Sequence, residues 1–148
     1  MSIVIGTNYV WNIVAASVLN LQAASFVWCA IKQKKRLDLP HHASVGSRET
    51  EKLSDEDNEE FTRFQTVKDS YLEYLPIVQS SVLLGGLFFP KVSAYASLGY
   101  MVGRLLYSIG YIKSGPDGKK LGDALICPSI ITLFGATFYG SVKALGFV

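Results

Sequence analysis

The sequence contains little cysteine and histidine, with two of each among 148 residues. Cys29 and Cys127 lie in separate apolar stretches, and neither has a Cys or His neighbour at metal-ligand spacing. They are predicted to be thiols packed within a membrane. His41 and His42 are adjacent in a polar loop, where solvated imidazoles are the expected state. We therefore predict no metal site.

Charge is absent from long stretches. Residues 1–31 contain no charged residue, and this stretch is longer than the roughly 20 apolar residues that a helix needs to cross a bilayer. No Lys or Arg precedes this run and no small-residue cleavage site follows it, so we expect a retained helix rather than a signal peptide. The net charge is only +2, and no basic stripe alternates with aromatics, which argues against a nucleic-acid partner.

Four such apolar segments predict an all-α fold, an integral membrane four-helix bundle with up-down-up-down topology and a single domain over residues 1–148. The predicted helices cover about residues 6–31, 56–89, 92–112 and 123–143, with a charged loop at 37–55. Ser54 followed by Glu56 and Asp57 is typical of a helix start. With these bounds Pro128 lies in the first turns of the last helix, where its missing amide costs least.

Lys and Arg gather at one end of the predicted bundle. They follow the first helix, precede the second, and lie between the third and fourth. The positive-inside rule then places the charged loop on the cytosolic or matrix side and both termini on the other side. We expect a multi-pass protein of the endoplasmic reticulum or a mitochondrial membrane, and the sequence does not separate these two.

Arg104 lies well inside the third apolar segment, where a cation is costly and needs an anionic partner or ligand. Tyr107 and Tyr111 follow at i+3 and i+7, so the three side chains share one helix face. On the second helix, Glu73 is the expected counter-ion for Arg104 or Arg63. Two interpretations stay open from these residues: an Arg–Glu pair that fixes helix register, and a ligand site.

Residues 103–111, Gly-Arg-Leu-Leu-Tyr-Ser-Ile-Gly-Tyr, resemble the third-helix signature of the membrane-associated proteins in eicosanoid and glutathione metabolism. Other parts of the chain are similar to that family in the same order. Residues 31–40 contain a cluster of basic residues after the first helix, followed by a proline. Residues 85–91 contain a Gly-Gly pair followed by Pro-Lys, and residues 114–120 form a loop in which glycine and proline precede two lysines. The resemblance covers nearly the whole chain.

The resemblance implies a homotrimer that binds glutathione, as co-substrate, between neighbouring subunits near the cytosolic face. An arginine would stabilise the thiolate. Matching positions imply glutathione contacts from Glu73, Tyr74, Arg104, Tyr107 and Tyr111. Arg104 together with Lys119 or Lys120 would be the catalytic cations.

The second helix departs from the family pattern. The family usually reads Gln-Arg-Ala-His-Gln-Asn-x-Leu-Glu, whereas residues 65–73 read Gln-Thr-Val-Lys-Asp-Ser-Tyr-Leu-Glu. Thr66 stands where the family has an arginine, so the chain lacks a forked cation that would bind a carboxylate with two hydrogen bonds. Lys68 stands where the family has a histidine. Ser70 keeps a hydrogen-bonding group with shorter reach, and Arg63, one turn before Thr66, is the candidate replacement. The family has a basic residue after the third helix, and in one alignment the matching position in this chain is Gly118.

Two functions follow. The first is an enzyme that conjugates or reduces lipophilic electrophiles or lipid hydroperoxides with glutathione, using a cation that lowers the thiol pKa. The second is a catalytically degenerate member that is a structural or assembly subunit of a larger membrane complex, with other membrane subunits and lipid as its partners. The changed motif at residues 65–73 favours the second. A conducting pore would show more lining polar groups than this sequence offers.

Overall fold

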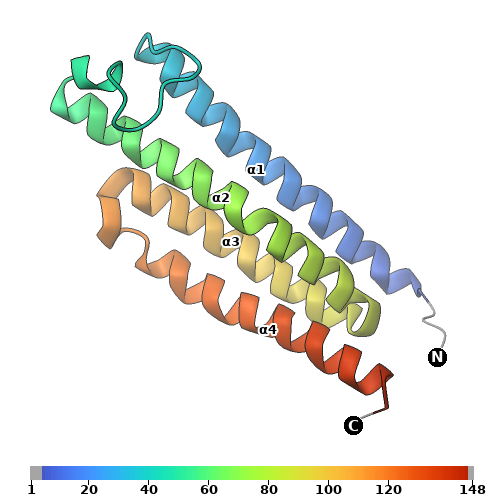
Figure 1. Ribbon diagram of the computed structural model, residues 1–148. Helices are drawn as coiled ribbons and strands as arrows, with labels where there is room; N and C mark the ends of the chain where they lie inside the picture. The colour runs from blue at the N-terminus through green and yellow to red at the C-terminus, as the bar shows by residue number, and fades with distance from the viewer. Residues whose placement is uncertain (1–4, 147–148) are drawn as a thin grey trace.

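The computed structural model describes residues 5–146, and within them it contains four long helices and no strand (Figure 1). The helices are α1 (Val10–Arg36), α2 (Asp55–Phe88), α3 (Pro90–Ser114) and α4 (Lys120–Ala144), and short 3-10 turns occupy Thr7–Tyr9, Thr50–Lys52 and Gly115–Asp117. They run up, down, up and down, so that the start of α1 and the end of α4 lie at the end of the bundle opposite the α1–α2 loop (Figure 1). The predicted all-α four-helix fold is confirmed.

The helix bounds differ from the sequence-based ranges in ways that local chemistry explains. α1 continues to Arg36 rather than ending at Ile31, because basic side chains in a last turn interact favourably with the helix dipole. α3 begins at Pro90, whose fixed φ suits a first helical position. α4 begins at Lys120, so Pro128 lies inside the helix and the prediction that it occupies the first turns is wrong.

α2 starts in the charged region and runs through to the far end of the bundle. The hydroxyl of Ser54 caps it by accepting a hydrogen bond from the Asp57 amide at 3.2 Å, and three acidic residues follow in the first turn. Pro76 lies inside the helix without ending it. Because α2 is continuous from residue 55 to 88, its polar first half and apolar second half belong to one rigid element.

The outer faces of the helices are apolar. Two helical stretches, Thr7–Arg36 and Lys120–Ala144, are long and apolar enough to cross a membrane, and each contains an 18-residue segment with a mean hydropathy of 1.6. α2 and α3 do not reach that level, since they carry more polar residues. Large apolar side chains nevertheless point outward from all four helices, among them Leu21, Leu84, Leu98 and Phe138. Such a surface requires lipid around it.

Glycine brings α3 and α4 into direct backbone contact at the charged end. A Cβ on Gly122 would lie 2.4 Å from the Tyr107 amide nitrogen, and one on Gly118 would lie 2.0 Å from the Gly110 carbonyl oxygen. Only residues without a side chain allow this approach. The backbone of Tyr107 is therefore held in place by α4, which positions one of the predicted site residues.

Candidate functional site

Arg104 is buried between α2 and α3, with 3% of its surface exposed. Its Nε donates to the Tyr100 hydroxyl at 2.9 Å, one turn earlier on α3. Its Nη1 donates to the Ser70 hydroxyl at 2.9 Å, and its Nη2 donates to the Ser70 carbonyl oxygen at 2.8 Å. The forked guanidinium thus clamps one residue of α2, and every acceptor is neutral.

Four tyrosine rings surround the same guanidinium. Its central carbon lies 5.0 Å from the ring centre of Tyr71, 5.1 Å from Tyr74, 5.6 Å from Tyr100 and 5.4 Å from Tyr107. Cations are attracted to aromatic faces at such distances, more strongly where water is excluded. Hydrogen bonds and rings together therefore hold a positive charge in the bundle without a carboxylate.

Glu73 is not the counter-ion that its position suggested. Its side chain is exposed, and within residues 5–146 it forms no ion pair with Arg104 or Arg63. Ser70, three residues earlier on α2, faces Arg104 instead. The expected Arg–Glu pair is therefore wrong for a single subunit, and Glu73 points away from its own bundle.

Tyr107 and Tyr111 form a parallel pair on α3. Their ring centres are 5.9 Å apart with an angle of 3° between the planes, and both side chains are half-buried. In the part of the chain that the structure describes, no hydrogen bond is made by their hydroxyls or by that of Tyr74 on α2. Three tyrosine hydroxyls on neighbouring helices are therefore open to a ligand or a partner.

Arg63 joins α2 to the end of α3. Its Nη1 donates to the Ile112 carbonyl oxygen at 3.2 Å, and its Nη2 pairs with Glu59 one turn earlier. The side chain is about one quarter exposed, so part of it stays accessible. Ile112 directly follows Tyr111, so the structure brings the guanidinium of Arg63 to the same end of α3 as the tyrosine pair.

The basic residues between α3 and α4 stand apart from Arg104. The ammonium of Lys120 pairs with Asp117 at 2.9 Å and is exposed, while Lys119 precedes the first turn of α4 and is half-buried. Arg104 lies ten residues before the end of α3, about 15 Å along the helix axis. The structure therefore does not bring together the two sets of cations that were predicted to activate the thiol.

The altered positions of α2 are occupied within the chain. The Thr66 hydroxyl donates to the Thr62 carbonyl oxygen, and the ammonium of Lys68 donates to the Gln65 side-chain oxygen and pairs with Asp69, both at 2.9 Å. Thr66 therefore offers no donor to a ligand. Arg63, one turn earlier, is the accessible cation of this helix face.

Residues 10–139 match the sequence profile of the MAPEG family, which includes membrane glutathione transferases and related proteins. The match spans most of the chain and all four helices of the bundle. The chain belongs to the MAPEG family. As a MAPEG protein with an apolar outer surface, it is an integral membrane protein, and members of this family use glutathione.

Sequence reasoning missed two groups of residues in this MAPEG protein. Tyr100 and Tyr71 complete the surroundings of Arg104, and the i−4 spacing of Tyr100 from Arg104 would have revealed the first of them. Lys34, at the end of α1, lies close enough to Lys68 on α2 for the two positive charges to repel each other. α1 and α2 therefore each contribute a cation toward the charged end of the bundle.

The two cysteines take no part in the site. Cys29 and Cys127 are unpaired and exposed on the outer surface. Within residues 5–146, no three His, Cys, Asp or Glu side chains are grouped as metal ligands would be. The polar groups of the candidate site are therefore tyrosine hydroxyls, guanidinium groups and ammonium groups, which suit an anionic organic ligand.

Proposed function

We propose that this MAPEG protein is a membrane-bound glutathione transferase or peroxidase that acts on lipophilic electrophiles or lipid hydroperoxides. We also propose, from the motif at residues 103–111, a relationship to microsomal glutathione S-transferase 3. In this proposal the active form is a homotrimer in the endoplasmic reticulum or a mitochondrial membrane. Lipid supplies the second substrate laterally, and glutathione is the co-substrate.

The observation that carries the proposal is the set of open polar groups on the α2–α3 face. The hydroxyls of Tyr74, Tyr107 and Tyr111 have no partner in the described chain, and part of the Arg63 guanidinium is accessible. Glutathione carries two carboxylates and several amide groups, which are the partners that guanidinium and hydroxyl donors bind. Glu73, exposed on the same helix, is suited to the ammonium group of the tripeptide.

Ser70 and Arg104 take a different part in the proposal. Both are committed to each other inside the subunit, so their contact with glutathione would be indirect. The guanidinium of Arg104 keeps an uncompensated positive charge behind the ring of Tyr107. A positive charge in a medium of low dielectric constant favours a nearby thiolate over the thiol. Lys119 and Lys120 remain the proposed cations at the outer end of the site.

The chemistry needs no group beyond the two substrates. In conjugation by substitution, the thiol first loses its proton to water, and the thiolate attacks an electrophilic carbon. A carbon–sulfur bond forms, the bond between that carbon and the leaving group breaks, and the leaving group departs as an anion. In peroxide reduction, two glutathione molecules are oxidised to the disulfide, and the hydroperoxide is reduced to an alcohol and water. Both reactions need the thiolate, which is why the cations matter.

A structural subunit is the second candidate function, and the occupied state of Arg104 favours it. Each guanidinium nitrogen of Arg104 donates one hydrogen bond inside the subunit, and Thr66 turns its hydroxyl back to its own helix. A buried arginine that fixes helix register is sufficient to explain both. In this alternative the open tyrosine hydroxyls and Glu73 contact other membrane subunits of a larger complex.

Glutathione binding to the purified protein in nanodiscs separates the two functions. We expect saturable binding at millimolar glutathione or below, and formation of the conjugate from a chlorodinitrobenzene electrophile. The Arg63→Gln variant should bind glutathione about tenfold more weakly, since it loses a charge-assisted hydrogen bond.

Lys143→Gln, at the opposite end of the bundle, is the matched control because it removes the same kind of charge away from the site. It should bind and conjugate as the wild type does. Absence of saturable binding in a folded wild-type protein would overturn the enzyme and leave the structural subunit.

A further inference from the structure

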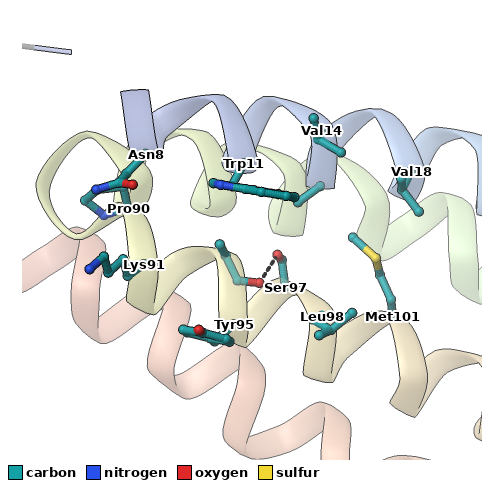
Figure 2. A pocket seen from close by; sticks show the side chains of 12 residues that line it. Asn8, Trp11, Val14, Val18, Pro90, Lys91, Tyr95, Ser97, Leu98 and Met101 are labelled. Carbon is teal, nitrogen blue, oxygen red and sulfur yellow. Dashed lines mark hydrogen bonds between the residues drawn. The ribbon is translucent and has the colours of Figure 1, made fainter. Parts of the chain in front are cut away.

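A groove of about 550 Å³ opens between the first half of α1 and the first half of α3 (Figure 2). Figure 2 shows Trp11 and Val14 on the α1 side and Tyr95 and Leu98 on the α3 side, with Met101 toward the far end. The groove lies at the end of the bundle opposite the α1–α2 loop, away from Arg63 and Tyr111. It is a separate feature from the candidate glutathione site.

The charged and amide side chains that line the groove lie at one of its ends. Lys91 and Asn8 lie beside Pro90 at this end (Figure 2). Deeper in the groove, the Ser97 hydroxyl donates to the Ala94 carbonyl oxygen at 2.7 Å, so it is already satisfied. The groove is therefore an apolar trough with a polar entrance.

The charge at this entrance has no acidic side chain to pair with among residues 5–146. Lys91 is exposed and forms no ion pair within residues 5–146. No Asp or Glu occurs in residues 1–37, 74–116 or 124–148, which contain every part of the helices at this end of the bundle. The only charged side chains there are Lys91 and Lys143, both positive. An anion must come from outside the described chain.

We propose that this groove binds an anionic phospholipid, with one acyl chain along the trough and the phosphate group at Lys91 and Asn8. Asn8 and Val18 both line the groove and are ten residues apart, so the trough extends about 15 Å along α1. A volume of this size holds an extended apolar chain rather than a few water molecules. A lysine ammonium is a common point-charge partner for phosphate.

Trp11 provides a direct probe, because it lines the groove and the chain contains only one other tryptophan. Trp28 lies in the second half of α1, toward the charged end, with Lys32 over its ring. In the Trp28→Phe variant, fluorescence reports on the groove alone. The protein is reconstituted in vesicles in which a small, equal fraction of either phosphatidylglycerol or phosphatidylcholine carries brominated acyl chains.

We expect brominated phosphatidylglycerol to occupy the position beside Trp11 about fivefold more than brominated phosphatidylcholine. This ratio corresponds to about 1 kcal/mol, the attraction expected for one lysine at a membrane surface. Adding Lys91→Gln should remove the preference. Lys143→Gln, the other cation at this end, should leave it unchanged.

Three outcomes would overturn the proposal. Equal quenching by both lipids would show an ordinary lipid-exposed surface without a site. Equal loss of preference in Lys91→Gln and Lys143→Gln would show a general surface potential. Quenching by neither lipid would show that protein, such as a second copy of the chain, covers the groove. None of these depends on whether the protein binds glutathione.

Discussion

The two polar regions between α2 and α3 differ in how completely the subunit satisfies them. Around Arg104, three donors meet three acceptors and four rings enclose the charge. Toward the charged end, the hydroxyls of Tyr107 and Tyr111 have no partner in the described residues, and Arg63 is partly exposed. Every guanidinium nitrogen of the first region, around Arg104, has a hydrogen-bond partner in the same subunit. In the second, open region, the hydroxyls of Tyr107 and Tyr111 have none among the described residues.

The motif at residues 103–111 therefore contains residues with two different roles, one that supports the fold and others that are available to bind a ligand. A buried arginine with a partner at each of its three nitrogens supports the fold, because removing it leaves unpaired groups in a medium without water. Open hydroxyls and a partly exposed cation contribute little to folding and are available for binding. We therefore expect substitutions in the two regions to act on different measurements.

Removing Arg104 should produce the largest effect. Arg104→Ala removes the donor from the Ser70 and Tyr100 hydroxyl oxygens and opens a cavity, so we expect a loss of about 3–5 kcal/mol in unfolding free energy. Arg104→Lys should lose roughly half as much, since it keeps the charge but not the fork. Thermal unfolding of the protein in detergent measures both. Arg63→Gln is the control and should change stability by about 1 kcal/mol or less.

The comparison fails if Arg104→Ala unfolds at the wild-type temperature while glutathione binding disappears. That result would make Arg104 a ligand-binding residue whose internal hydrogen bonds contribute little. Arg104 would then belong with the ligand-binding residues Tyr107, Tyr111 and Arg63 rather than with the residues that stabilise the fold.

Two tyrosine-to-phenylalanine changes on α3 compare the regions with a smaller chemical difference. Tyr100→Phe removes the acceptor of the Arg104 Nε proton, so we expect about 1–3 kcal/mol of destabilisation and little change in glutathione affinity. Tyr107→Phe removes a hydroxyl without a partner, so stability should change by about 0.5 kcal/mol or less. Its glutathione affinity should fall about 2- to 10-fold, the value of one hydrogen bond. Calorimetry of folding and of binding separates these results, and identical behaviour of the two variants would contradict the distinction.

Much of the fold follows from the sequence, because long uncharged segments in a membrane have few alternatives to helices. The charged loop, the Ser54 cap and the importance of Arg104 are all readable there. The residue of α2 that faces Arg104 could not be predicted from the sequence. Ser70 and Glu73 are three residues apart, and a modest rotation of α2 decides which one faces Arg104. That rotation depends on the packing of Tyr71 against Phe26, whose ring centres are 4.6 Å apart, and no spacing rule supplies it.

The extent of α4 illustrates a second limit. The sequence predicted a helix over about residues 123–143 with Pro128 in its first turns, but α4 begins at Lys120, and Gly122 packs against the backbone of Tyr107. Contacts between α3 and α4 override the local preference of proline, as tertiary packing commonly does. The position of Tyr107, and with it the open region, was therefore beyond local sequence patterns.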